Sequence, residues 1–71
     1  MNKAITGTIE ATTRRQNTVG GNPRWTIRMN GNNYNTKDDT ACAYRVSLGD
    51  VGRAATLDLD GRGQVIVYDS H

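Results

Sequence analysis

The chain has 71 residues, a formal net charge of +2, one Cys and one His. A chain this short forms at most one domain, spanning residues 1–71, and it buries only about 60% of the surface that its unfolded form exposes. This composition excludes an internal disulfide and a structural zinc site, and the lack of any run of 18 apolar residues excludes a membrane-spanning helix.

The first expected element is a long strand over residues 3–14. Ile5, Gly7 and Ile9 alternate there with polar residues, which is the period of two of a half-buried strand. Because Gly7 has no side chain to pack, it is typical of a bulge or of a strong bend in a small barrel. Residues 16–23 (QNTVGGNP) follow and are expected to form a mobile surface loop.

A second strand is expected over residues 24–29. Trp25 shares a face with the aliphatic residues of this strand, so it is predicted to lie in the core. The Asn30-Gly31 dipeptide predicts a tight hairpin turn, since both residue types accept a positive φ. A short third strand is expected over residues 33–36.

A helix is expected over residues 37–46, because the period of the pattern changes at Thr36. Thr36 and Asp39 resemble a capping box with Asp in place of Glu, and acidic residues favour the start of a helix. The spacing predicts an apolar stripe with two further residues on its flank. The stripe is formed by Ala41, Tyr44, Arg45 and Leu48, and the flank by Cys42 and Val46.

The last third of the chain predicts a hairpin with strands over residues 53–60 and 64–68. Residues 60–63 (Asp-Gly-Arg-Gly) form its turn. Residues 65–68 (VIVY) are apolar on both faces. This pattern indicates burial on both sides, or one face covered by the helix or by a second subunit.

The predicted fold is mainly β with one short helix, in the order β-β-β-α-β-β. This order and the glycine within a long first strand resemble the OB-fold family over almost the whole chain, although no OB-fold sequence motif is matched. The resemblance implies a five-stranded, partly open barrel with the helix at one end. A five-stranded SH3-like barrel, or an open sheet with the helix packed across it, fits the element lengths as well.

Residues 21–46 (GNPRWTIRMNGNNYNTKDDTACAYRV) resemble small uncharacterised proteins of actinobacterial bacteriophages. In that group a Gly-Asn-Pro-Arg turn enters a strand, and a Thr-x-x-Asp segment precedes an Ala-rich helix. The resemblance implies an accessory protein in the cytoplasm of an infected host cell, and it brings no known activity. A single thiol likewise suits a reducing cytoplasm.

Basic side chains concentrate in the first half of the chain. Residues 1–37 carry six Lys or Arg against one Glu, whereas residues 38–71 carry three Arg against six Asp. If the two halves occupy different faces, one side attracts anionic ligands. The OB-fold resemblance implies single-strand binding on the second and third strands and the loops beside them. The candidate nucleic-acid-binding residues are Arg14, Arg15, Arg24, Arg28, Tyr34 as a stacking surface, and Lys37.

No combination of residues predicts catalysis, a metal or a cofactor. Cys42 has no His partner other than the terminal His71, so a thiol nucleophile is not indicated. The acidic residues of the last third lack the further oxygen ligands of a calcium loop. These residues are Asp58, Asp60 and Asp69. We expect a small non-enzymatic binding module.

Two other interpretations compete with nucleic-acid binding. The arginines suit an ordinary solvated surface, because surfaces that bind single strands normally present two or more aromatic rings and only Tyr34 is available. The VIVY segment and the acidic second half favour a protein-interaction module instead. Such a module would capture a host protein or form a homodimer through an exposed edge strand.

Overall fold

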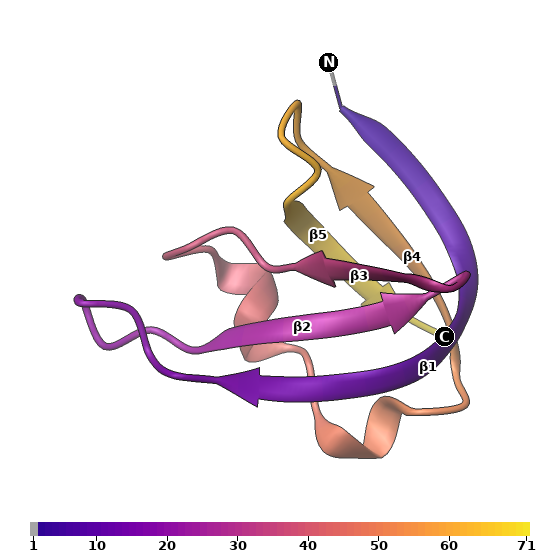
Figure 1. Cartoon of the computed structure of the whole chain (residues 1–71), viewed down its shortest axis with the longest axis horizontal. Coiled ribbons are helices and arrows are strands. Elements are labelled where there is room, and N and C mark those ends of the chain that lie inside the picture. The colour runs from indigo at the N-terminus through magenta and orange to yellow at the C-terminus, as the bar shows by residue number, and fades with distance from the viewer. Residues whose placement is uncertain (1) are drawn as a thin grey trace.

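The computed structural model describes residues 2–71 and shows one five-stranded antiparallel sheet with little helix (Figure 1). The strands are β1 (Lys3–Arg15), β2 (Arg24–Met29), β3 (Asn32–Asn35), β4 (Ala54–Leu59) and β5 (Val65–Ser70). Their order in the sheet is β3-β2-β1-β4-β5. The predicted mainly-β class is therefore confirmed. In the described part of the chain, no helix has the length and apolar character needed to cross a membrane.

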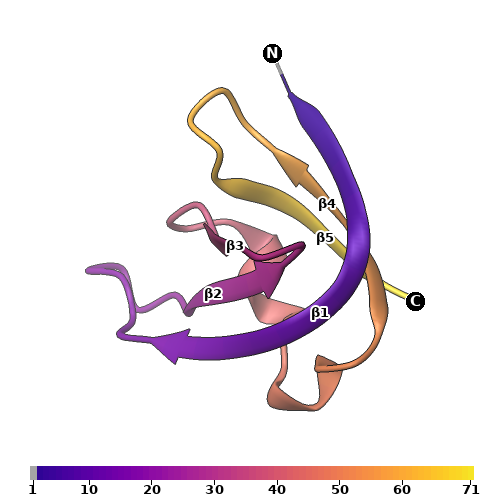
Figure 2. The ribbon, with the colours of Figure 1, turned by 45° about the vertical axis from the view of Figure 1, so that its right-hand side comes forward.

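Strand β1 joins two halves of the sheet because it is long enough to pair with both neighbours. Its residues from Lys3 to Thr8 pair with β4, and those from Ile9 to Arg15 pair with β2. Figure 2 shows β1 as one continuous arc that passes β4 and then β2. The two halves of the sheet consequently face each other across the core.

The bulge in β1 lies at Glu10, where the register with β2 shifts between Ile9 and Ala11. The extra residue changes the phase of the strand, so that Ile9 is buried before the bulge and Thr12 is buried after it. Of the two alternatives expected at Gly7, the bulge is not observed there, since Gly7 pairs regularly with β4. A Cβ at Gly7 would lie 2.5 Å from Oδ1 of Asn30, so any other residue there would have to displace the Asn30 side chain.

The β2–β3 connection is the tight hairpin expected from the Asn30-Gly31 pair. Both residues have a positive φ, of 55° and 77°, and Met29 pairs directly with Asn32. Strand β3 begins and ends one residue earlier than expected. It begins at Asn32 because that residue pairs with Met29, and it ends at Asn35 because Thr36 forms an isolated parallel bridge with Val65 of β5. This bridge and a hydrogen bond of 2.9 Å from the N–H of Lys37 to the carbonyl of Val65 join the two edge strands. The sheet is thus curled but is not closed into a barrel.

The predicted helix over residues 37–46 is wrong. The chain forms two 3₁₀ turns instead, η1 (Ala41–Tyr44) and η2 (Leu48–Asp50). The hydroxyl of Thr36 is not free to cap a helix, because it accepts a hydrogen bond of 3.0 Å from the N–H of Trp25. Asp39 has a φ of 60°, which interrupts a right-handed helix. The capping box is formed by Ser47 and Asp50 at η2.

The expected apolar stripe is exposed, and residues that were predicted on its flank are buried. Tyr44 and Leu48 are 65% and 69% exposed, whereas Cys42 and Val46 are part of the core. The reason is the period: a 3₁₀ turn has three residues per turn, so it does not present the α-helical stripe.

The core lies between the two halves of the sheet, and η1 covers its open side. It contains Trp25, as the alternation of β2 predicts, and Tyr68 of β5. The complete set is Ile9, Trp25, Ile27, Met29, Cys42, Ala43, Val46, Ala55, Leu57, Leu59, Val65 and Tyr68. Val67 differs from its neighbours in the VIVY segment, since it is 48% exposed on the outer side of β5.

Candidate nucleic-acid interface

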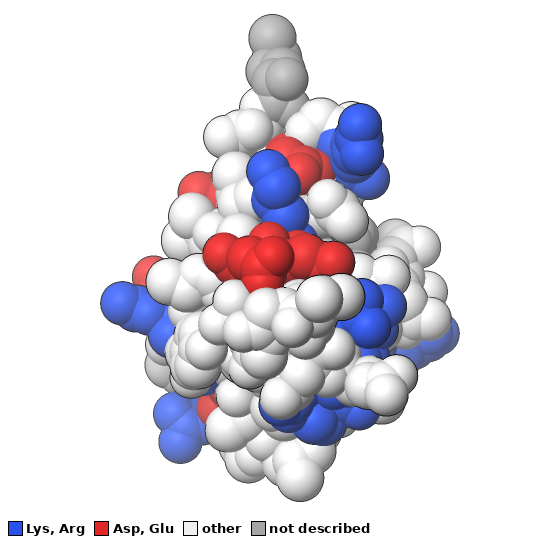
Figure 3. Space-filling view, turned by 90° about the vertical axis from the view of Figure 1, so that its left-hand side faces the viewer, with Lys and Arg blue, Asp and Glu red and all other residues white. Residues whose placement is uncertain are grey.

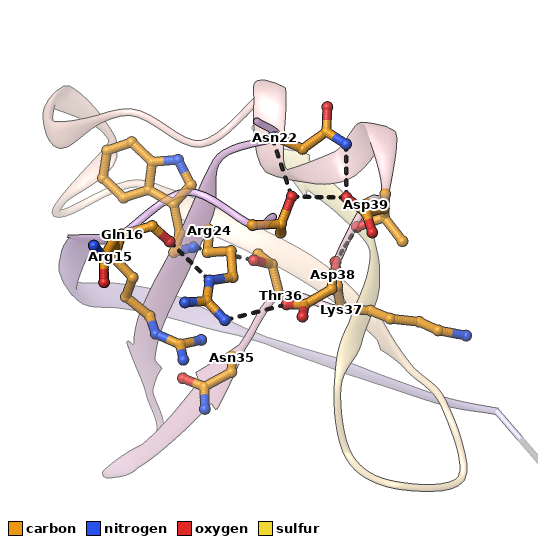
Figure 4. Close-up of polar contacts among 12 residues, drawn as sticks. Arg15, Gln16, Asn22, Arg24, Asn35, Thr36, Lys37, Asp38 and Asp39 are labelled. Carbon is orange, nitrogen blue, oxygen red and sulfur yellow. Dashed lines mark hydrogen bonds and ion pairs between the residues drawn. The ribbon is translucent and has the colours of Figure 1, made fainter. Parts of the chain in front are cut away.

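Three of the candidate arginines lie on the outer face of β1, β2 and β3. Because Trp25 and Ile27 point into the core, their neighbours in β2 point outward. Cross-strand pairing adds Arg15 opposite Arg24, and asparagines of β3 opposite Thr26 and Arg28. We call this surface the β2 face; it consists of Arg15, Arg24, Thr26, Arg28, Asn33 and Asn35. The close-up in Figure 4 shows Arg15, Arg24 and Asn35 side by side.

Tyr34 does not belong to the β2 face. The two-residue hairpin places it opposite Ile27, which is fully buried, so its ring points inward and packs against the core. Its hydroxyl accepts a hydrogen bond of 3.4 Å from Nδ2 of Asn32. The structure therefore separates the expected stacking ring from the arginines that were expected to act with it.

Arg14 is not part of the β2 face. Its neighbour Arg15 points outward, and consecutive residues of a strand point to opposite sides of the sheet. The guanidinium carbon of Arg14 is 5.8 Å from the centroid of the Trp25 ring, a cation–π distance. The same guanidinium donates to the carbonyl oxygens of Arg15 at 2.6 Å and Arg24 at 3.3 Å, and to Oδ1 of Asn17. Arg14 thus closes the open end of the β1–β2 pair and covers the indole.

Arg24 and Arg28 each contact an acidic residue. Nε of Arg28 lies 3.2 Å from Oε1 of Glu10, and Nη1 of Arg24 lies 3.7 Å from Oδ1 of Asp38. Arg24 also donates from Nε to the carbonyl of Gln16 at 2.7 Å. Arg24 is partly buried and the other three side chains are exposed, and ion pairs at surface positions contribute about 0–1 kcal/mol, so phosphates can replace these partners at low cost. Within residues 2–71, neither Arg15 nor Lys37 forms an ion pair.

The loop of residues 16–23 is anchored to the segment after β3, although its composition predicts mobility. Oδ1 of Asp39 accepts hydrogen bonds from Oγ1 of Thr18 at 2.8 Å and from Nδ2 of Asn22 at 2.7 Å (Figure 4). The hydroxyl of Tyr44 donates to Oδ1 of Asn22 at 2.6 Å. The hydrogen bonds from Asn22 and Thr18 also lower the pKa of Asp39. This network was not predicted, since its members are far apart in the sequence.

Basic side chains do not form one continuous patch at this end of the molecule. Figure 3 shows acidic side chains across the middle of the face, with Lys and Arg above, below and to the sides. The contact between Arg24 and Asp38 joins the basic first half to the acidic second half. The charge separation expected from the sequence is therefore partly cancelled here.

A buried carboxylate that the sequence did not reveal lies in η2, outside the β2 face. Oδ2 of Asp50 accepts hydrogen bonds from the hydroxyl of Tyr68 at 2.6 Å and from the N–H of Ser47 at 3.1 Å. Burial raises the pKa of Asp50, but these hydrogen bonds outweigh it and leave the pKa below its usual value. Burial and the bond to Asp50 raise the pKa of Tyr68. The pair joins η2 to β5.

The thiol of Cys42 is also buried. It lies 3.2 Å from Oγ1 of Thr40 and 3.4 Å from the carbonyl of Val65. Among residues 2–71, no cluster of three or more His, Cys, Asp or Glu side chains is arranged to hold a metal ion.

Comparison of the chain with protein-family models, with curated proteins and with solved structures finds no match.

Proposed function

We propose that this protein binds single-stranded nucleic acid weakly and without sequence specificity through the β2 face. The observation that supports the proposal is the convergence of Arg15, Arg24 and Arg28 on one outer surface. Arg15 and Arg24 are direct cross-strand neighbours, while Arg28 lies about 13 Å further along β2. The pair and the single arginine are therefore spaced to contact different phosphates of one strand.

The composition of the β2 face suits electrostatic binding better than base stacking. Its six residues include no aromatic ring, because Tyr34 packs inward. Asn33 and Asn35 add amide donors and acceptors beside the arginines. Without stacking, affinity comes mainly from neutralised phosphates and falls steeply with salt.

The proposal includes an OB-like arrangement of the sheet. The shared strand β1 and the parallel bridge between Thr36 and Val65 support this arrangement over an SH3-like one, since the bridge lies where a partly open barrel of this strand order would close. A location in the cytoplasm, and in a host cell for a bacteriophage protein, belongs to the same proposal and rests on the single thiol and the sequence resemblance.

The salt dependence of oligonucleotide binding tests this function. Fluorescence anisotropy of a labelled oligothymidylate would be measured between about 50 mM and about 200 mM salt. Replacing Arg24 and Arg28 by Ala removes two phosphate contacts. The slope of log affinity against log salt should therefore become shallower by about 1.4, at about 0.7 per single-strand contact.

A double variant with the same loss of charge serves as the control. Arg45 and Arg53 are exposed and lie outside the β2 face. Replacing both by Ala should leave the slope unchanged. Equal effects of the two double variants would show that net charge alone attracts the oligonucleotide, and the β2 face would lose its role.

A second candidate function is self-association as a homodimer. Val67 is 48% exposed on edge strand β5, beside a groove of about 240 Å³. The groove is lined by Ala41, Cys42, Arg45, Ile66, Val67 and Tyr68. An exposed apolar residue on an edge strand is a site for pairing with a second chain. Sedimentation equilibrium distinguishes the candidates: a dimer that Val67→Glu dissociates supports self-association, and a monomer at all concentrations rejects it.

A further inference from the structure

Two basic side chains outside the β2 face, Lys37 and Arg62, line a hollow of about 410 Å³. Lys37 reaches it from the segment after β3, and Arg62 reaches it from the β4–β5 turn. The hollow is lined by Lys37, Asp60, Gly61, Arg62 and Gln64. The hydrogen bond from the N–H of Lys37 to the carbonyl of Val65, of 2.9 Å, holds these two segments together.

The β4–β5 turn holds the backbone of Arg62 in a defined position. Oδ1 of Asp60 accepts hydrogen bonds from the backbone N–H of Arg62 at 2.8 Å and of Gln64 at 3.0 Å. The N–H of Asp60 donates to the carbonyl of Gln64 at 2.9 Å, and Gly63 takes the positive φ of 79° that the turn requires. Since the amides of Arg62 and Gln64 are used inside the turn, their side chains remain as the donors that face the hollow.

The charges around the hollow favour an anion. Neither Lys37 nor Arg62 forms an ion pair with any residue between 2 and 71. Asp60 is the single carboxylate of the lining, and its Oδ1 is already bound by the turn. The backbone N–H of Gln64, together with that of Arg62 and the nearby Lys37 and Arg62 charges, lowers the pKa of Asp60. Two cations therefore oppose one ionised carboxylate.

We propose that this hollow binds a phosphate group, with the Lys37 ammonium and the Arg62 guanidinium as cationic donors and the side-chain amide of Gln64 as a neutral donor. A guanidinium matches two phosphate oxygens at once, and an ammonium contributes a compact charge. The volume lies within the range of small-molecule sites and exceeds that of a phosphate ion, so it has room for a nucleotide. The shared chemistry is a phosphate, carried by a free ion, a nucleotide or the end of a nucleic-acid strand.

The hollow is a separate site and does not require binding at the β2 face. In Figure 4, the Lys37 side chain extends away from Arg15 and Arg24, and Asp38 lies between the two groups. A phosphate in the hollow therefore approaches from a different direction than one on the β2 face.

Titration of ¹⁵N-labelled protein with inorganic phosphate and with adenosine monophosphate, at constant ionic strength, tests the site. Saturable shifts of the Gly61, Arg62 and Gln64 amide signals are expected for both probes. Arg62→Gln or Lys37→Gln should weaken binding by about tenfold. Arg53→Gln, which removes one charge from an exposed site elsewhere, should leave the binding unchanged. Shifts without saturation, or equal weakening by Arg53→Gln, would overturn the proposal.

Comparison of the probes identifies the source of the phosphate. Tighter binding of adenosine monophosphate supports a nucleotide or a strand end, while equal binding supports the free ion. The Arg24 and Arg28 double variant separates this site from the proposed function. This variant should keep the phosphate-induced shifts at the hollow, whether or not it binds oligonucleotides less tightly than the natural protein.

Discussion

Tyr68→Phe removes the hydrogen bond between the Tyr68 hydroxyl and Asp50 while keeping the aromatic ring in place. Both side chains are buried, at 2% and 8% exposure, so water does not readily replace the lost donor. A hydrogen bond to a charged group contributes about 2 kcal/mol in such surroundings. For a domain of this size, that loss lowers the melting temperature by about 10 °C.

The change is measured by urea unfolding followed through the fluorescence of Trp25, the sole Trp and a buried one. A loss of about 2 kcal/mol should lower the midpoint by about 1–2 M urea. Tyr44→Phe is the matched control. It also removes a tyrosine hydroxyl bond, of 2.6 Å to Asn22, but Tyr44 is 65% exposed and the loss should stay below about 0.5 kcal/mol.

The pH dependence of Tyr68→Phe identifies the bond as one to a carboxylate. The pKa of Asp50 lies below its usual 3.8 in the folded protein, so its ionised form contributes stability above that pH, and this stability is lost as the pH falls through the folded-state pKa. The difference between the natural protein and the variant should therefore be largest at neutral pH and shrink as the pH falls below 3.8, the usual value for this carboxyl group. An undiminished difference at low pH, or a loss no larger than that of Tyr44→Phe, would refute the reasoning.

Two further substitutions test the contacts that shape the sheet. Gly7→Ala brings a Cβ against Oδ1 of Asn30 and should cost about 1 kcal/mol in thermal unfolding. Asn30→Gly in the same chain should remove this cost, since glycine also accepts the positive φ at that position; no recovery would contradict the steric explanation. Thr36→Val keeps the side-chain shape but leaves the N–H of Trp25 without its acceptor, and chemical unfolding should show a loss of about 2 kcal/mol. A stability equal to that of the natural protein would show that this bond does not hold the β2–β3 junction.

Local patterns were sufficient for the strands and for the position of Trp25. Strand β2 begins and ends at the predicted residues, because strict alternation is visible within six residues and the Asn30-Gly31 turn ends it. The same turn also determined the face of Tyr34. Counting pairs back from a two-residue hairpin places Tyr34 opposite Ile27, so this correction could have been made from the sequence.

The helix and the candidate site depended on contacts between distant residues. Thr36 has the pattern of a helix cap, yet its hydroxyl is taken by Trp25 across the hairpin. Asp39 has the pattern of a first helical turn, yet it binds Thr18 and Asn22 of the β1–β2 loop. Lys37 and Arg62 line the same hollow because Thr36 forms a bridge with Val65 of β5, and no local pattern indicates that bridge.

The sequence by itself determined that the chain is mainly β, where most of its strands lie, and that its basic residues concentrate in the first half. Periodicity, turn residues and charge are properties of neighbouring residues, and they do not depend on where a strand lies in the fold. The tertiary structure alone decided which basic side chains share a surface, which acids oppose them, and which hydroxyls remain free to cap. These outcomes depend on hydrogen bonds and ion pairs between distant segments, and such partners come within reach only once the sheet has curled.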